Sequence, residues 1–473
     1  MVAWLRAGGW MVAIRVLAPL GALIIEGWPA LVGAVLIQEG CLWLVGRLTE
    51  ACQRALCARL FLGAYGLRIA IALPTHVVAR LGNGNGSLFQ DDYTNDLVGE
   101  WLVRIASGDG TVSIFAGHQH LLDGLYPYLL MGLYTLFGYT PLLPKLINIG
   151  LAALSAVLVF ELTRRVFSQR AALLAGVGAA VVPTMVIWSI VSLKETLVLF
   201  LALVALRLVQ FLSTAPAHSS RIGDALVLMA ALLALLVDLR PTLAVMLVGL
   251  LVVVWGARSP FRRRLRSWQF GFATLALVLI VGGGLWVARS RTSNRPLTGV
   301  VEDVVLQIRH RRAQEAASAR SQLRPEQEVL SATGSQLPLA EAASDAQPFS
   351  VTSDVVEPLA FALLAPAPWQ AHTLTELAAG AEMLGWYALL VGTCLSWLAQ
   401  PRQRLFVICL VIFVVANWLV LAASEGNLGN LLRHRLLLDP ALLLLGCGGL
   451  EWLVRQVIAR RSQTILTHQY VAQ

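Results

Sequence analysis

The chain has 473 residues, of which 57% are hydrophobic and only 13% are charged, and its formal net charge is +9. This composition excludes an ordinary soluble globular domain, in which about 25% of residues are charged. It predicts an all-α membrane protein that crosses the bilayer many times. The positive charge does not indicate nucleic-acid binding, because the chain lacks basic, aromatic-interleaved soluble modules.

Apolar runs near the length that crosses a bilayer recur along the chain. They predict about twelve transmembrane helices, at residues 10–25, 28–46, 60–79, 144–163, 170–190, 196–213, 222–238, 241–257, 268–288, 381–399, 404–423 and 432–452. No small-residue cleavage site follows the first run, so the first pair is predicted to be an uncleaved hairpin. The predicted divisions are a hairpin at 1–56, a core at 57–288 with its first outer loop at 80–143, a long outer loop at 289–380, and C-terminal helices with a tail at 381–473.

Arginine-rich loops alternate with loops that are poor in positive charge, which sets the orientation because basic loops stay in the cytoplasm. The basic loops include Arg47, Arg164, Arg258, Arg402 and Arg455. The predicted outer segments are 80–143, 191–195, 239–241, 289–380 and 424–431. The excess positive charge therefore lies mostly inside, where it suits anionic membrane lipids.

Two adjacent acids, Asp91 and Asp92, follow the first core span, with Tyr93 next to them. A carboxylate beside the outer face of a membrane can deprotonate an acceptor or hold a metal. The plain alternative is a solvated loop charge or a helix N-cap. Helical spacing of apolar residues predicts two interfacial helices in the same loop, at 97–106 directly after the acids and at 121–137.

Other charged groups fall on the same predicted face: Lys194 with Glu195, Asp238 with Arg240, and Glu425 with Arg433 and Arg435. Such cations could bind a phosphate diester at the headgroup level. Arg433 and Arg435 stand out because they oppose the positive-inside trend. An exposed ion pair for Lys194 and snorkelling for Arg240 are the alternatives. Arg68 lies inside a span and needs a polar partner, in a structural or a lipid-phosphate role.

A divalent metal ion is the candidate cofactor, with His118 and His120 as ligand candidates beside the aspartates. Acceptor contact or simple exposure explains two loop histidines equally well. The long outer loop is rich in Ala, Ser, Gln and Glu at 313–336, which predicts a mobile segment. Substrate gating and a tolerated insertion both remain open for this loop.

Several motifs carry a family resemblance. FQDDYTNDLVGEWLVRIASG (Phe89–Gly108) resembles the first outer loop of the GT-C glycosyltransferases, especially bacterial members related to protein O-mannosyltransferases and to lipid A aminoarabinose transferase. The segment at Leu125–Phe167 is similar to their juxtamembrane segment and second core span. Shorter similarities are SLKETLVLF (Ser192–Phe200), LRPTL (Leu239–Leu243), APAPW (Ala365–Trp369) and GNLGNLLRHRLLLDP (Gly426–Pro440). The first 50 residues have no recognised counterpart.

The resemblance implies a GT-C-like bundle in a bacterial plasma membrane, with its active site facing outside. It implies inverting transfer of a sugar from a polyprenyl-phosphate-linked donor to an extracytoplasmic glycan, lipid or protein. Family members place an essential acid where Asp91 and Asp92 lie, but they often have Asp-Glu, so the base could be either aspartate. Glu195 matches a second acidic position. The substrate-binding candidates are Tyr93, Lys194, Glu195, Arg240, Arg433 and Arg435.

Three other classes of function remain. A transporter would show an internal repeat and broken helices near the midplane, whereas the polar residues of this chain gather at one face. An O-antigen polymerase or ligase would share the lipid-linked donor and the large outer loop, but it would not require paired acids after the first core span. A non-catalytic membrane scaffold is the third alternative.

Overall fold

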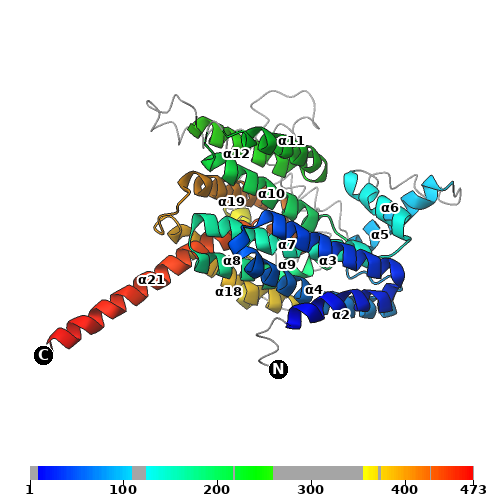
Figure 1. The fold of residues 1–473 in the computed structure, drawn as a ribbon, viewed down its shortest axis with the longest axis horizontal. Coiled ribbons are helices and arrows are strands. Elements are labelled where there is room, and N and C mark those ends of the chain that lie inside the picture. Colours follow the sequence, from blue (N-terminus) through cyan, green and yellow to red (C-terminus); the bar gives the residue numbers. More distant parts are fainter. Residues whose placement is uncertain are drawn as a thin grey trace, which may run out of the picture. The chain divides into compact units, whose positions relative to one another are not determined.

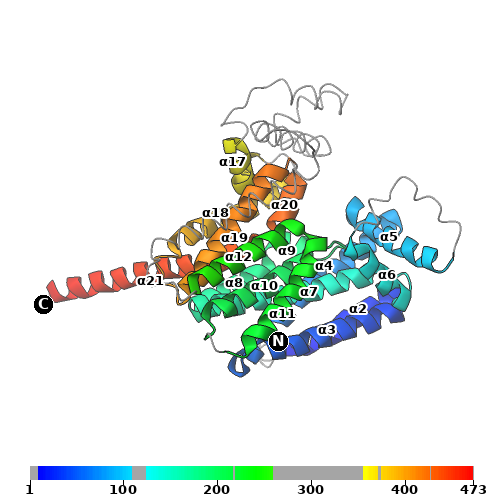
Figure 2. The same ribbon diagram turned by 90° about the horizontal axis from the view of Figure 1, so that it is seen from above.

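The computed structural model describes residues 9–108, 124–216, 219–258, 355–370, 374–426 and 428–471. All regular elements in these ranges are helices, which confirms the predicted all-α membrane fold (Figures 1 and 2). The predicted span at 268–288, His118, His120 and most of the 289–380 loop lie outside the described residues.

Nine helices in the described part are long and apolar enough to cross a membrane. They are α2 (Gly9–Glu26), α3 (Trp28–Leu48), α4 (Arg54–Asn83, preceded by the 3-10 turn η1, Ala51–Gln53), α7 (Leu142–Val166), α10 (Glu195–Thr214), α11 (Arg221–Leu239), α12 (Pro241–Arg258), α19 (Arg404–Ser424) and α21 (Asp439–Val471). The shorter elements are α5 (Gln90–Ala106), α6 (Leu125–Phe137), α8 (Gln169–Val181), α9 (Pro183–Ile187), α17 (Glu357–Leu364), η7 (Pro368–Gln370), α18 (Leu374–Leu395, apolar over Ala379–Leu395) and α20 (Leu428–Arg435).

Three predicted boundaries differ from the structure. The span expected at 170–190 is two short helices, α8 and α9, because Pro183 cannot continue the hydrogen-bond ladder of α8. The span expected at 432–452 starts later, at Asp439, and Arg433 and Arg435 lie in the separate helix α20. The interfacial helix expected after the acids begins before them, at Gln90.

The chain divides into two compact units. The first contains Met1–Leu162, Leu173–Arg207 and Leu226–Pro241, and the second contains Thr163–Ala172, Leu208–Ala225 and Thr242–Gln473. The first unit therefore holds the N-terminal hairpin, the first outer loop and the turn before α10. The sequence divisions at 56, 288 and 380 remain predictions.

Helices of the first unit approach closely at small residues. A Cβ atom at Gly33 of α3 would overlap Leu143 of α7, and one at Gly150 of α7 would lie 2.7 Å from Ile37 of α3. Close approach at glycine is a common way for membrane helices to gain van der Waals contact where lipid provides no hydrophobic driving force. This contact packs the N-terminal hairpin directly against α7.

In the second unit, α18 packs against the N-terminal part of α21. A Cβ atom at Gly449 of α21 would overlap the backbone of Gly392 in α18, so this crossing requires glycine. A buried cluster joins α17, α18, α19 and α20, with Trp386 and Leu431 among its members. These contacts build the core of the second unit.

Arg68 of α4 compensates for the helix break at Pro183. Proline has no N–H group to bond the carbonyl of Ala179, and the guanidinium of Arg68 donates instead to the carbonyls of Ala179 at 3.1 Å and Ala180 at 2.8 Å. It also donates to the Ser189 hydroxyl at 2.9 Å. Arg68 is fully buried and donates four hydrogen bonds within the protein, which favours the structural one of its two predicted roles.

The Arg68→Met substitution should therefore destabilise the protein, because the carbonyls at the end of α8 would lose their donors. The expected loss is about 3 kcal/mol or more, given about 1–3 kcal/mol for each buried polar group left unsatisfied. Thermal unfolding of the purified protein in detergent measures it. Arg59→Met, at an exposed position of the same helix, is the matched control. Equal melting temperatures for the two variants would contradict this role.

Candidate active site

The predicted acid pair lies in the first turn of α5, which follows Phe89. The ring of Phe89 packs against Trp188, with 5.2 Å between the ring centroids. Carboxylates are favourable at this end of a helix because the peptide dipoles concentrate positive potential there. The two acids nevertheless have different surroundings: Asp91 is exposed, whereas Asp92 is fully buried.

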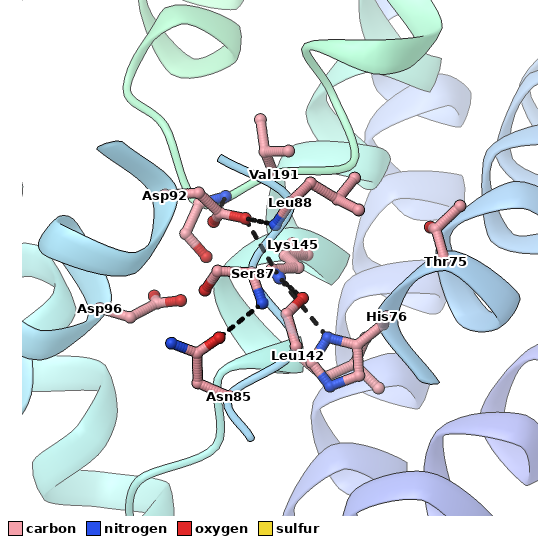
Figure 3. Close-up of polar contacts among 12 residues, drawn as sticks. Thr75, His76, Asn85, Ser87, Leu88, Asp92, Asp96, Leu142, Lys145 and Val191 are labelled. Atoms are coloured by element: carbon pink, nitrogen blue, oxygen red, sulfur yellow. Dashed lines mark hydrogen bonds and ion pairs between the residues drawn. The ribbon is translucent and has the colours of Figure 1, made fainter. Parts of the chain in front are cut away.

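Asp92 holds three segments together. Its Oδ1 accepts a hydrogen bond from the backbone N–H of Ser192 at 2.6 Å, and its Oδ2 accepts one from Leu88 at 3.0 Å. The ammonium of Lys145, on α7, lies 3.4 Å from the same Oδ2. Both carboxylate oxygens are therefore used inside the protein. Figure 3 shows Asp92 facing Leu88 and Lys145.

Lys145 is buried and has three polar neighbours. Its Nζ donates to the carbonyl of Gly86 at 2.6 Å and lies 3.4 Å from Nδ1 of His76 on α4, in addition to Asp92 (Figure 3). Gly86 has a positive φ of 80° and contacts the His76 ring so closely that a Cβ atom would overlap it. The cation that pairs with the buried acid is thus Lys145, which lies at the start of the span predicted at 144–163.

A second buried acid, Asp96, lies one helical turn after Asp92. Its Oδ1 accepts a hydrogen bond from the hydroxyl of Tyr134 on α6 at 2.6 Å, and its Oδ2 has no partner among the described residues. Burial, reinforced by the negative charge of Asp92, raises the pKa of Asp96 to about 8. Burial and the charge of Asp96 also raise the pKa of Tyr134 well above its ordinary value. Asp96 is therefore expected to carry a proton at neutral pH.

The turn before α10 is fixed from two sides. Asn148 of α7 donates to the carbonyls of Val191 at 2.7 Å and Leu193 at 2.9 Å. Asn95 of α5 donates to the carbonyl of Ser192 at 3.1 Å. This turn therefore presents the Ser192 N–H to Asp92 in one position.

The predicted substrate-binding residues of the first unit take several positions. Lys194 and Tyr93 are half-buried, and Glu195 is buried at the start of α10. Burial raises the pKa of Tyr126 well above its ordinary value, and the charges of Asp96 and Glu195 add to this effect. Arg240 is half-buried between α11 and α12. The neighbouring Asp238 accepts a hydrogen bond from the N–H of Leu125 and so anchors the start of α6.

In the second unit, the predicted residues Arg433 and Arg435 lie on α20. The guanidinium of Arg435 is buried, donates to the carbonyls of Phe361 at 3.2 Å and Ala362 at 2.7 Å, and stacks over Trp386 at 5.2 Å. Burial lowers its pKa to about 10. Arg433 is half-buried, and His434 between them lies 2.7 Å from Glu425. Arg435 therefore fastens α17 to α20.

A metal site is not formed by the described part of the chain, where no group of three or more His, Cys, Asp or Glu side chains could hold an ion. At Asp92, the ammonium of Lys145 occupies the place that a cation would take. His118 and His120 lie outside the described residues, so metal binding by this pair stays a prediction.

Residues 125–286 match the dolichyl-phosphate-mannose-protein mannosyltransferase family. The match begins at the first residue of α6, so the acids of α5 lie outside it. No curated protein and no solved structure matches the chain. The family match confirms the predicted resemblance and supports a membrane glycosyltransferase of the GT-C type.

The protonated state of Asp96 predicts a pH dependence of stability. The folded protein keeps this proton up to about pH 8, whereas the unfolded chain loses it near 3.8. The contribution of Asp96 to the free energy of unfolding is therefore fully present below pH 3.8. It falls by about 1.4 kcal/mol per pH unit as the pH rises to about 8. Asp96→Asn, which cannot titrate, should flatten this fall.

The free energy of unfolding is measured by denaturation in detergent, for the wild-type protein and for Asp96→Asn. The pH values, between 5 and 8, are chosen to lie inside this window. Asp224→Asn, which changes an exposed acid in the first turn of α11, should keep the wild-type profile. Parallel pH profiles for the wild-type protein and Asp96→Asn would contradict a buried, protonated Asp96.

Proposed function

We propose that the protein transfers a sugar, with inversion, from a polyprenyl-phosphate-linked donor to an acceptor on the outer side of a bacterial plasma membrane, with Asp91 as the general base. The family match supports a lipid-phosphate donor in general terms. The alternation of basic and non-basic loops supports the outward orientation. The acceptor is a glycan, lipid or protein outside the cytoplasm.

The choice of base rests on one observation, which is that the two adjacent aspartates differ in burial. Asp92 is fully buried, and both of its oxygens already accept hydrogen bonds from backbone N–H groups. An acceptor hydroxyl could reach Asp92 only if the residues that bury it moved. Asp91 belongs to the same helical turn and is exposed. A general base must be within hydrogen-bonding reach of the proton that it removes, which favours Asp91.

The reaction is a single displacement. The Asp91 carboxylate takes the proton of an acceptor hydroxyl, and the acceptor oxygen forms a bond to the anomeric carbon from the face opposite the phosphate. The bond between the anomeric carbon and the phosphate oxygen breaks, and its electron pair leaves with the polyprenyl phosphate. The reaction needs no oxidant or reductant, and the proton stays on Asp91 until solvent removes it.

The departing phosphate gains negative charge, and a nearby cation stabilises it. Lys194 and Arg240 are the half-buried candidates in the first unit, which also contains Asp91. Arg433 of the second unit stays a sequence-based candidate. Arg435 is a weaker candidate than its sequence position suggested, because carbonyl groups of α17 already accept its hydrogen bonds. Lys145 is unsuitable because it is buried against Asp92.

Single substitutions of the two acids should have separable effects. Asp91→Asn should abolish transfer and leave the melting temperature near the wild-type value, because Asp91 is exposed. Asp92→Asn should lower stability by about 3 kcal/mol or more, because it leaves Lys145 as an uncompensated buried charge. Asp224→Asn is again the control for an exposed acid in a first turn.

Mass spectrometry of envelope glycans from cells that carry each variant, or no copy of the protein, measures transfer. The expected result is one glycan signal that disappears both without the protein and with Asp91→Asn, at normal abundance of the protein in the membrane. Full transfer by Asp91→Asn would reject Asp91 as the base. Identical glycans with and without the wild-type protein would reject the proposed function in that cell.

A further inference from the structure

The buried polar contacts of the site continue beyond Lys145 into the N-terminal hairpin. His76 lies between Lys145 and Glu26, with its Nε2 atom 2.9 Å from Oε1 of Glu26. Asp92, Lys145, His76 and Glu26 come from four different helices, and their side chains are at most 6% exposed. Glu26 is the last residue of α2, far in sequence from the acids and outside the matched region 125–286.

The partners of His76 determine which ring nitrogen carries the proton. The ammonium of Lys145 can only donate, so Nδ1 of His76, 3.4 Å away, must accept. The ring proton is then on Nε2, where it is donated to the carboxylate of Glu26. If the proton were on Nδ1, two donors would face each other in a buried place. Glu26 therefore selects the tautomer of His76 that is compatible with Lys145.

Glu26 has a second function, which a useful variant must preserve. Its Oε2 accepts a hydrogen bond at 2.9 Å from the N–H of Leu142, the first residue of α7, and Lys145 follows on the first turn of that helix. Complete removal of the side chain would thus uncap α7 as well as release His76. Arg80, half exposed, is the other charged neighbour, 3.9 Å from Oε1.

We propose that Glu26 of the N-terminal hairpin is a positioning residue for the acid pair: through His76 it holds the ammonium of Lys145 against Asp92, and Asp92 in turn sets the first turn of α5 that presents Asp91. The role in transfer rests on the proposed function, whereas the linkage among these side chains does not. The N-terminal hairpin, for which the sequence resemblance gives no recognised counterpart, thereby becomes a part of the site in this chain.

The Glu26→Gln substitution separates the two functions of the residue. Its carboxamide oxygen can still accept from the Leu142 N–H, but its NH₂ group then faces His76 and can only donate. This reverses the tautomer and places an N–H of His76 against Lys145. The defect should be relieved in a His76→Asn background, because the carboxamide oxygen there can accept from Lys145 whatever residue 26 is.

The experiment is a double-mutant cycle of Glu26→Gln and His76→Asn in the full-length protein, read as melting temperature in detergent and as glycan transfer in cells. Glu26→Gln alone should lower transfer by about 10-fold, the loss expected for one charge-assisted hydrogen bond. In the His76→Asn background, the same change should alter transfer by less than about 2-fold and should barely alter the melting temperature. Lys145→Met is a second background, without the ammonium, in case the first does not fold.

Glu39→Gln is the matched control, because Glu39 lies in the same hairpin and pairs with the exposed Arg15 at 2.6 Å. It should leave transfer near the wild-type level, as expected for an exposed ion pair. Equal shifts of melting temperature by Glu26→Gln in the wild-type and His76→Asn backgrounds would overturn the linkage, whatever the protein transfers. Unchanged transfer by Glu26→Gln, when Asp91→Asn is inactive, would overturn the positioning role alone.

Discussion

The ammonium of Lys145 is the group on which the arrangement of the first outer region depends. It is buried, and a buried charge is costly unless its partners satisfy it. Asp92, the Gly86 carbonyl and Nδ1 of His76 provide those partners from α5, the loop before it and α4. A buried ion pair of this kind adds little net stability, but it penalises every arrangement in which one partner is missing. The start of α5 is therefore held in one position relative to α4 and α7.

This constraint gives the adjacent aspartates Asp91 and Asp92 different surroundings. Successive residues of an α-helix point about 100° apart, so a helix that buries Asp92 cannot also bury Asp91 in the same place. Asp96, one turn after Asp92, falls on the buried face instead and meets Tyr134. The buried face thus pairs one acid with lysine and a second acid with tyrosine. Asp91, on the exposed side of the same turn, is the proposed base.

Hydropathy and charge were sufficient to predict the helices, since span length follows from bilayer thickness, and nine of the described helices meet that length. They failed where local chemistry ended a helix, as at Pro183. The acid pair could be found as two adjacent carboxylates, and a helix beginning at Gln90 would have grouped Asp92 with Asp96. The helix was expected to start after the acids because the periodicity of apolar residues begins at Leu97. Glu26 and His76 were not singled out, because their contacts join residues 50 positions apart or more.

Carboxyl labelling of the unmodified protein tests most directly whether Asp91 is exposed while Asp92 is buried. Intact cells are treated with a water-soluble carbodiimide and a membrane-impermeant amine, and labelled positions are mapped by fragmentation of the peptide that contains Asp91 and Asp92. Labelling of Asp91 on intact cells, with Asp92 and Asp96 labelled only after unfolding, is the predicted result. Labelling of Asp92 as readily as Asp91, or of Asp91 only after the cells are permeabilised, would contradict it.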